Sequence, residues 1–255
     1  MNKIKTTMLC AAVAAVLSTA GCGGGGGSSS SPAPAPVASA AEGLWVGTTG
    51  DNRAITGLVF ENGLFYVLYS SVGDPTTIAG VVQGNGSTTG ATFLSTNSKD
   101  FNLEGDGVLD ASVSANFSAK ANFNGTVNYG PGLNNTFTST YDSDYELTPS
   151  TSALAGTFTG EVASSVGNEA ATITIASNGS LSGSGVSGCT VSGTATPRAR
   201  GNAFVISLTF GGAPCLFANQ TLSGIGYFDA TEKRLYSATP NASRTDGILF
   251  VGVKP

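Results

Sequence analysis

From residue 42 to the C-terminus, apolar and polar residues alternate in short runs. The clearest run covers residues 111–129. Its odd positions, from Ala111 to Tyr129, are apolar except for Gly125, and its even positions are all polar. An alternation of period two places apolar side chains on one face of a β-strand. No sustained 3.6-residue apolar period, which would indicate a helix, is present. The pattern predicts an all-β fold.

One strand over residues 111–129 would be about 60 Å long, which exceeds the usual length of a strand. The run must therefore fold back, and Asn124-Gly125 is the turn signal within it. Because the apolar residues keep the same parity on both sides of this dipeptide, an odd-length loop with a glycine bulge is favoured over a two-residue turn.

The second half of the chain divides into eight short strands joined by short turns, which is typical of an up-and-down barrel or a compact sandwich. In one of these strands Phe204, Ile206, Leu208 and Phe210 form a large apolar face, which we expect to be core. The predicted strands cover residues 156–162, 171–176, 180–185, 189–196, 203–210, 220–227, 234–239 and 247–253.

The two halves also show a weak internal repeat. The segment 43–47, Gly-Leu-Trp-Val-Gly, aligns with 156–160, Gly-Thr-Phe-Thr-Gly, and an Asn-Gly dipeptide follows each, at 62–63 and 178–179. We interpret the chain as two antiparallel β-barrel or sandwich domains, residues 42–149 and 152–255, with the boundary near Pro149. The alternative is a single larger sandwich that contains both halves.

The N-terminus has the pattern of an export signal. Lys3 and Lys5 precede an apolar run from Met8 to Leu17, and small residues lead to Cys22. The apolar run has about ten residues, whereas a membrane-spanning helix needs roughly twenty. This arrangement resembles a bacterial lipoprotein precursor. The resemblance implies a signal peptide at 1–21, acylation of the Cys22 sulfur and, because Gly23 follows, sorting to the outer membrane.

Residues 22–41 are rich in Gly and Ser, then in Pro and Ala. This composition cannot bury a core, and it combines a flexible coil with a short polyproline II spacer. We therefore predict a disordered tether that holds the folded body away from the membrane surface.

Four cysteines are present, and two of them remain in the folded body. Cys10 leaves with the signal peptide and Cys22 carries lipid, so Cys189 and Cys215 are left. In an exported chain, such a pair indicates one disulfide in the second domain. The alternatives are a metal site or reactive thiols, but the chain has no histidine to complete a metal set and neither cysteine has a second cysteine beside it.

The charge distribution is uneven between the two halves. Residues 42–149 hold eleven acidic and three basic side chains, and residues 152–255 hold five acidic and six basic ones. The chain is therefore a poor candidate for binding nucleic acid. The first domain is the one expected to attract a basic partner or a cation.

The sequence does not indicate an enzyme. Without histidine, Ser-His-Asp and Cys-His systems and the usual zinc sites are excluded. If residues 141–146 form a strand, Asp142, Asp144 and Glu146 share one face and could pair carboxylates for acid–base chemistry. More simply, these charges protect an edge strand from pairing with other chains. A carboxylate-dependent hydrolase ranks third among the functions considered, and no cofactor is expected.

A second acidic segment is similar to the first half of a calcium loop. Asp100, Asn102, Glu104 and Asp106 alternate, and Gly105 occupies the sixth position. The closing acid is missing, because position 111 is alanine. An ordinary polar turn is the simpler interpretation of this weak calcium candidate.

Two strands are apolar on both faces, residues 64–69 and 248–251. A strand that is buried on one face only should alternate, so the second face packs against the other domain or forms an exposed binding patch. Phe65, Val67 and Tyr69 are the candidate binding row. Trp45, the only tryptophan, is expected to be a core anchor.

Together these features resemble surface lipoproteins of the transferrin-binding protein B and factor H-binding protein type, which carry paired β-barrels after a glycine-rich tether. The resemblance implies a lipid-anchored, non-catalytic binding or structural module of the cell envelope, with the membrane and a protein or glycan as partners. The alternative function is a lipocalin-like carrier of a small apolar ligand. Ala111, Ala115, Ala119 and Ala121 could leave room for such a ligand inside a barrel.

Overall fold

The computed structural model describes residues 39–255. The predicted signal peptide, Cys22 and most of the predicted tether lie outside the described residues. Seventeen strands, one short 3-10 helix and one short α-helix make up the described chain, so the all-β fold class is confirmed. Within residues 39–255, no helix combines the length and apolar character needed to cross a bilayer.

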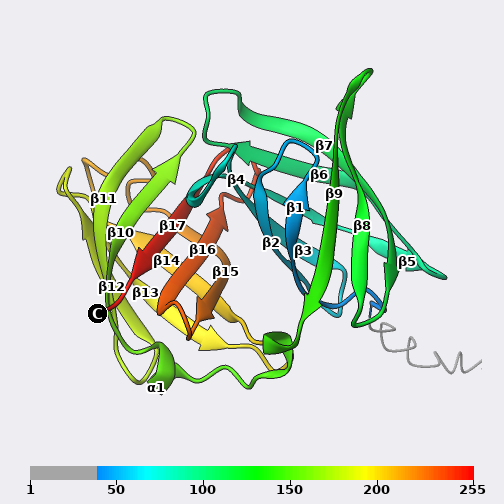
Figure 1. Cartoon of the computed structure of the whole chain (residues 1–255). Coiled ribbons are helices and arrows are strands. Elements are labelled where there is room, and N and C mark those ends of the chain that lie inside the picture. Colours follow the sequence, from blue (N-terminus) through cyan, green and yellow to red (C-terminus); the bar gives the residue numbers. More distant parts are fainter. Residues whose placement is uncertain (1–38) are drawn as a thin grey trace, which may run out of the picture. The chain divides into compact units, whose positions relative to one another are not determined.

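The first nine strands form a rolled sheet (Figure 1). Its strand order is β4-β3-β2-β1-β9-β8-β7-β6-β5. Strand β4 also pairs with β6, from Gly80 opposite Asn102 to Gln83 opposite Lys99, and this pairing closes an eight-stranded barrel. Strand β5 lies outside the closed ring and pairs only with β6. The bounds are β1 Gly43–Thr49, β2 Ala54–Val59, β3 Leu64–Ser71, β4 Asp74–Asn85, β5 Ser87–Thr89, β6 Thr92–Asn102, β7 Gly107–Ser118, β8 Asn122–Gly130 and β9 Leu133–Asp142.

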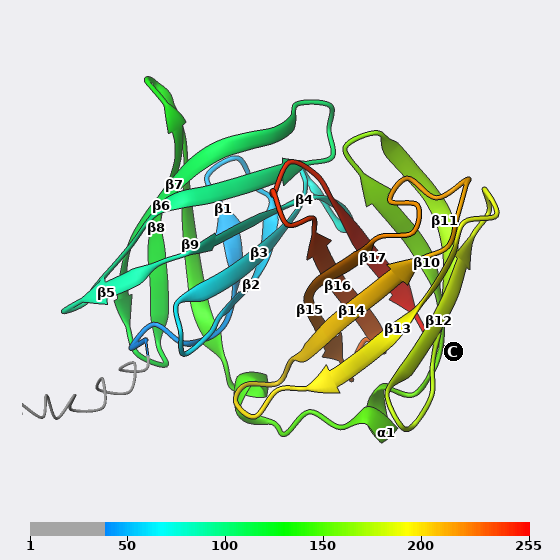
Figure 2. The ribbon, with the colours of Figure 1, turned by 180° about the vertical axis from the view of Figure 1, so that it is seen from behind.

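The last eight strands form a second closed barrel in which each strand pairs with the next and β17 pairs with β10 (Figure 2). All eight predicted strands of this half are confirmed, with ends that differ by a few residues. The bounds are β10 Gly156–Ser164, β11 Gly167–Ile175, β12 Ser180–Gly185, β13 Thr190–Pro197, β14 Phe204–Phe210, β15 Thr221–Asp229, β16 Arg234–Pro240 and β17 Gly247–Val253. The helices η1 Ser143–Glu146 and α1 Thr151–Leu154 lie in the connection.

Each barrel has its own apolar core, and a third cluster joins residues of both halves. In the third cluster Tyr66 and Leu68 of β3 pack with residues of β15–β17 such as Tyr227 and Leu249. This contact explains why residues 64–69 and 248–251 are apolar on both faces. Independent folding of residues 42–149 and 152–255 stays a prediction.

The fold-back within residues 111–129 is not at Asn124-Gly125. Strands β7 and β8 are joined by the three residues 119–121, with Lys120 at a φ of 54°, and Gly125 pairs with Ala115 inside β8. The loop has an odd number of residues, as the unchanged parity of the apolar positions predicts. The predicted position of the turn, at Asn124-Gly125, is wrong. A Cβ on Gly125 would lie 2.2 Å from the Ser114 carbonyl oxygen, so this glycine permits a close strand approach rather than a turn.

The acidic segment 141–146 is not a strand. β9 ends at Asp142, whose carboxylate accepts a hydrogen bond from the backbone of Asp144 and caps η1. Glu146 instead pairs with Lys120. The expected single face of three carboxylates therefore does not form, because the capping interaction turns the chain out of the extended conformation.

The predicted tether extends too far toward the C-terminus. Ser39 donates a backbone hydrogen bond to Glu61, and the side chain of Ala41 is fully buried in the first barrel. The Trp45 Nε1 donates to the Ala41 carbonyl oxygen at 3.1 Å. Residues 39–41 therefore belong to the folded body.

Candidate functional site: the interior chamber of the first barrel

One end of the first barrel is closed by aromatic rings. Strand alternation points Trp45, Phe65, Phe93 and Phe123 inward, and all four are buried. Phe123 lies 5.4 Å from Trp45 and 5.3 Å from Phe93 between ring centroids, and Phe65 lies 5.6 Å from Phe93. These are favourable separations for aromatic pairs. We call these four rings the aromatic floor.

Above the aromatic floor the barrel is hollow. A cavity of about 320 Å³ extends from these rings to the opposite end of the barrel, where Asp51 and Leu133 reach solvent. Apolar side chains of six strands form most of its wall between the two ends. We call this cavity the chamber. Its apolar wall residues include Ile55, Val67, Val82, Val113, Val127 and Phe137.

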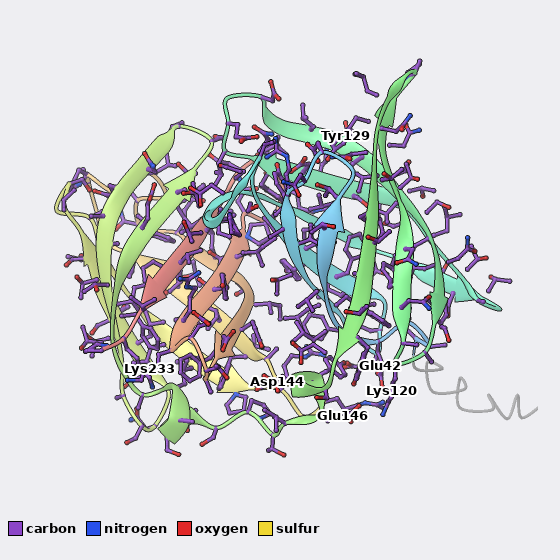
Figure 3. All side chains as sticks on the ribbon, viewed as in Figure 1. Glu42, Lys120, Tyr129, Asp144, Glu146 and Lys233 are labelled. Atoms are coloured by element: carbon purple, nitrogen blue, oxygen red, sulfur yellow. A yellow bond between two sulfur atoms is a disulfide. The ribbon has the colours of Figure 1, made fainter. Side chains whose placement is uncertain are left out.

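The chamber contains one buried acid. Asp100 of β6 is 2% exposed and points inward. The Tyr69 hydroxyl donates to its Oδ1 and the Tyr129 hydroxyl donates to its Oδ2, each at 2.8 Å. Figure 3 shows Tyr129 at the end of the barrel opposite Glu42 and Lys120. The buried acid is therefore held in a fixed orientation by one hydroxyl on each oxygen.

The environment shifts the ionisation of all three groups. Burial raises the pKa of Asp100, although the hydrogen bonds from Tyr129 and Tyr69 act in the opposite direction. Burial, and next the nearby charge of Asp100, raise the pKa of both tyrosines well above the usual value. The two hydroxyls therefore stay protonated and remain hydrogen-bond donors.

A glycine makes room for one of these donors. A Cβ on Gly80 would lie 2.3 Å from the Tyr69 hydroxyl oxygen. Since real Cβ atoms do not approach so closely, any side chain at position 80 would displace the hydroxyl from Asp100. Because position 80 of β4 is a glycine, the Tyr69 hydroxyl has room to reach Asp100.

Charged residues surround the open end of the chamber. Arg53 donates to Asp51 at 2.8 Å and to the Ser70 carbonyl oxygen at 3.0 Å, and it forms an ion pair with Glu104 at 2.8 Å. Burial opposes a higher pKa for Arg53, but the hydrogen bonds with Glu104 and Asp51 raise it. Partial burial likewise opposes the shift at Asp51, but hydrogen bonds from Asn135, Thr49 and Arg53 lower the pKa of Asp51 to about 2.

The candidate row Phe65, Val67 and Tyr69 lies inside the first barrel and lines the chamber. Phe65 is 2% exposed and Tyr69 is 8% exposed, so the interpretation of this row as an exposed patch is wrong. The opposite row packs in the cluster shared by the two halves. A binding role for Phe65, Val67 and Tyr69 stays a prediction, now for a ligand inside the barrel.

The calcium candidates do not converge on one point. Asp100 faces the chamber, whereas Glu104 pairs with Arg53. The Asn102 side chain accepts hydrogen bonds from the backbone of Glu104 and Asp106, which is an ordinary Asx turn. Among residues 39–255 there is no group of three or more Asp, Glu, Cys or His side chains placed to hold a metal ion.

Sequence reasoning did not identify Asp100 as a buried acid, nor Arg53 and Tyr129 as parts of one site. The pairing of β6 with β7 shifts register between Ser95 and Ser98, so Phe93 and Asp100 both point inward although their parities differ. This irregularity interrupts the period-two pattern. Signals were available for single residues only: Tyr69 lies in the candidate binding row, Asp100 is one of the calcium candidates, and Tyr129 ends the apolar run that begins at Ala111.

The second barrel contains a hollow of about 340 Å³ at one end, lined by residues such as Val162, Val191 and Phe250. Its other end is filled by buried side chains that include Phe158, Ile175 and Leu235. The predicted disulfide between Cys189 and Cys215 is confirmed, and it links the start of β13 to the β14–β15 loop.

No protein-family profile and no curated protein matches this chain. Among solved structures, a candidate outer membrane protein of Bacteroides fragilis is 16% identical, with 84% of this chain and 96% of that chain covered, at a TM-score of 0.27. Isotype 1 transferrin-binding protein B of Neisseria meningitidis is 10% identical, with 80% of this chain and 58% of that chain covered, also at 0.27. The second belongs to the type that the sequence resembles. At these scores the fold assignment rests on the strand pairing alone.

Proposed function

We propose that this protein is a lipoprotein of the outer membrane, anchored through Cys22, whose first barrel binds a small and mostly apolar molecule in the chamber. The role is binding rather than catalysis. Of the two functions that the sequence suggests, this combines the non-catalytic envelope module with the carrier of a small ligand.

The observation that carries the proposal is the chamber itself. Ligand pockets typically measure about 300–1,000 Å³ and are lined mainly by apolar side chains with a few polar groups. A cavity of about 320 Å³ with valine walls, an aromatic floor and one buried acid has these properties. Empty space inside a core reduces stability, roughly in proportion to its volume. A hollow that is kept open around a buried, hydrogen-bonded acid therefore favours a ligand.

The polar residues in the chamber support binding rather than a reaction. Both oxygens of Asp100 already accept tyrosine hydroxyl hydrogen bonds. The chain has no histidine to act as an acid or base near neutral pH. Polar groups held in a fixed orientation in an apolar pocket serve to orient a ligand.

The fluorescence of Trp45 tests ligand binding directly. It is the only tryptophan of the chain and lines the chamber, so its emission reports on this barrel alone. We expect 2-phenylethanol, a small and mostly apolar probe, to shift the emission with a saturable dependence on concentration. Val127→Phe, which fills the chamber, should abolish the shift.

The matched control is Val191→Phe, which makes the same change in the hollow of the second barrel. It should leave the Trp45 response intact. A response that persists in Val127→Phe, with circular dichroism showing that both variants fold, would contradict the proposed site.

Membrane anchoring has a separate test. Replacement of Cys22 by Ser removes the sulfur that would be acylated, so the protein should leave the membrane fraction and lose labelling by a palmitate analogue. Retention of the Cys22→Ser protein in membranes, together with no label on the wild type, would contradict the lipoprotein assignment.

A further inference from the structure

We propose that the chamber selects a molecule with an apolar body and one cationic group, of the arylalkyl- or alkylammonium class, with the cation beside Asp100 and the apolar body toward the aromatic floor. This inference rests on the proposed function, since it requires the chamber to hold a ligand. It adds the charge of that ligand and the residue that recognises it.

Asp100 retains the capacity to bind a cation. Each oxygen of a carboxylate has two acceptor positions, and the tyrosine hydroxyls occupy one on each oxygen. The two remaining positions can accept N–H bonds from an ammonium group. Because Tyr69 and Tyr129 hold the carboxylate in place, a ligand does not have to orient it, and preorganisation of this kind favours affinity.

No ion pair forms between Asp100 and a base within residues 39–255, although the charge of Arg53 acts on Asp100 from a distance and opposes the rise of its pKa on burial. The guanidinium of Arg53 is engaged by Asp51, by Glu104 and by the Ser70 carbonyl oxygen. Its single positive charge is therefore shared between two carboxylates that lie closer to it. Asp100 is therefore left without a direct ion-pair partner, a place that a cationic ligand can take.

The charges around the chamber favour a cation over an anion. Of the charged side chains that line it, Asp51, Asp100 and Asp106 are acidic and Arg53 is the only base. Residues 42–149 as a whole hold eleven acids and three bases, which attracts cations over a longer range. A carboxylate ligand would meet repulsion from Asp100 and would compete with Asp51 and Glu104 for Arg53.

Aromatic faces add to the recognition. Tyr69 and Tyr129 flank Asp100, and the face of Tyr69 already lies 5.5 Å from the guanidinium carbon of Arg53. Aromatic faces attract cations, more strongly when water is excluded. Below Asp100 the wall is mostly apolar down to Trp45 and Phe93, and the Ser139 hydroxyl there donates to the Phe123 carbonyl oxygen. The polarity of the chamber wall thus falls from the mouth to the aromatic floor, and it matches a ligand that has a cationic group at one end and an apolar body at the other.

The size of the chamber limits the ligand. At about 320 Å³ the chamber lies at the lower end of the range for ligand pockets, so it suits a small ligand with a single ring. Phenethylammonium has this size, and 2-phenylethanol and phenylacetate are its neutral and anionic analogues. The three probes differ in charge while they keep the same aromatic body.

The decisive experiment compares the three probes by Trp45 fluorescence and calorimetry on wild type and Asp100→Asn. We expect phenethylammonium to bind wild type about tenfold more tightly than 2-phenylethanol, and phenylacetate to bind most weakly. In Asp100→Asn, which keeps the shape without the charge, phenethylammonium should fall to the affinity of the alcohol. The control Asp110→Asn changes an exposed acid of β7 and should preserve the preference.

The pH dependence in wild type gives a second measurement that does not depend on a variant. Asp100 faces Tyr69 and Tyr129 as donors, with Arg53 and Asp106 as the other charged neighbours. Since the ammonium group binds the ionised acid, the ratio of phenethylammonium to alcohol affinity should rise with pH. The alcohol affinity should stay constant.

The outcomes separate the two proposals. Equal affinities for the alcohol and phenethylammonium, or an ammonium preference that survives in Asp100→Asn, would overturn the cation inference and leave the proposed function standing. If neither probe binds wild type, the proposed function fails as well. A pH-independent affinity ratio would also overturn the cation inference, even if Asp100→Asn did not fold.

Discussion

The two barrels share features of their backbone. In each, the first strand carries a glycine that faces the last strand: a Cβ on Gly47 would lie 2.0 Å from the Thr138 carbonyl oxygen, and a Cβ on Gly160 would lie 2.0 Å from that of Val251. In each, an Asn-Gly turn joins the second and third strands, with φ of 80° at Gly63 and 83° at Gly179. The weak repeat in the sequence therefore marks equivalent positions.

Their interiors differ in polarity rather than in volume. Each barrel fills one end with side chains, such as Trp45 and Phe93 in the first and Phe158 and Leu235 in the second, and each has a hollow at the other end, of about 320 Å³ and 340 Å³. Among the described residues, only the hollow of the first barrel contains a buried acid, Asp100. Strand closure and interior content are therefore set by different residues. Close-packed glycines and turns shape the barrel, and inward side chains decide whether it can hold a ligand.

The largest expected effect concerns the filled end of the second barrel. Phe158→Ala removes a fully buried ring and should lower the free energy of unfolding by about 3–5 kcal/mol. Phe65→Ala should cost at least about 1 kcal/mol less, because one side of Phe65 borders the chamber and already lacks packing partners. Urea unfolding of both variants measures the difference. Equal losses would mean that the two interiors are packed alike.

Loss of the disulfide is expected to cause the second largest loss of stability. Changing both Cys189 and Cys215 to Ala should destabilise the second barrel by about 2–4 kcal/mol, because the unfolded chain gains freedom, and should leave the first barrel nearly unchanged. Trp45 fluorescence follows the first barrel during unfolding, and circular dichroism follows both. If Trp45 reports the full loss of stability, the two halves unfold as one unit and their independence is disproved.

The equivalence of the two glycines gives a matched pair. Gly47→Ala and Gly160→Ala should each reduce stability by about 1–3 kcal/mol, because each new methyl group must displace the neighbouring strand. Thermal unfolding of the two variants compares them. A large loss for one and none for the other would break the structural correspondence between β1 and β10.

The smallest expected effect is the pH dependence of stability at the two acids of the chamber. The folded-state pKa of Asp100 is raised, so the stabilisation linked to its protonated form is lost as pH rises through that pKa. Asp100→Asn should therefore gain stability relative to wild type as pH increases toward about 7. The pKa of Asp51 is lowered to about 2, so its contribution is present above about pH 4 and is lost below it.

Asp51→Asn should accordingly be less stable than wild type near neutral pH and should approach it in acid. Melting temperatures measured across pH for both variants check the two signs. Parallel curves for Asp100→Asn and Asp51→Asn would mean that the two acids do not differ in environment as the structure shows.

Much of the fold follows from patterns that the sequence displays openly. The strands β10–β17 could be predicted because period-two alternation and short turns are regular there. The turn near residue 125 could not, since Gly125 is required by a close approach that is visible only in three dimensions. Likewise the two faces of β3 are equally apolar, and alternation alone cannot tell which row faces the chamber.

The site was harder to predict than the fold. Asp100 lies after a register shift, and its partners Tyr69 and Tyr129 come from β3 and β8, far apart in the chain. Sequence spacing contains no information on such contacts. Two signals pointed to this half as a site for cations, the excess of acids in residues 42–149 and the calcium candidate that begins at Asp100.

The central claim is that the first barrel, and not the second, binds small apolar molecules in its interior. Valine methyl resonances measured by NMR during titration with 2-phenylethanol test it most directly, because Val67, Val82, Val113 and Val127 line the chamber whereas Val162 and Val191 line the hollow of the second barrel. We predict saturable shifts for these four valines and for Val59, which also lines the chamber, and none for Val162 and Val191. Shifts confined to Val162 and Val191, or no saturable shift at any valine, would contradict the account.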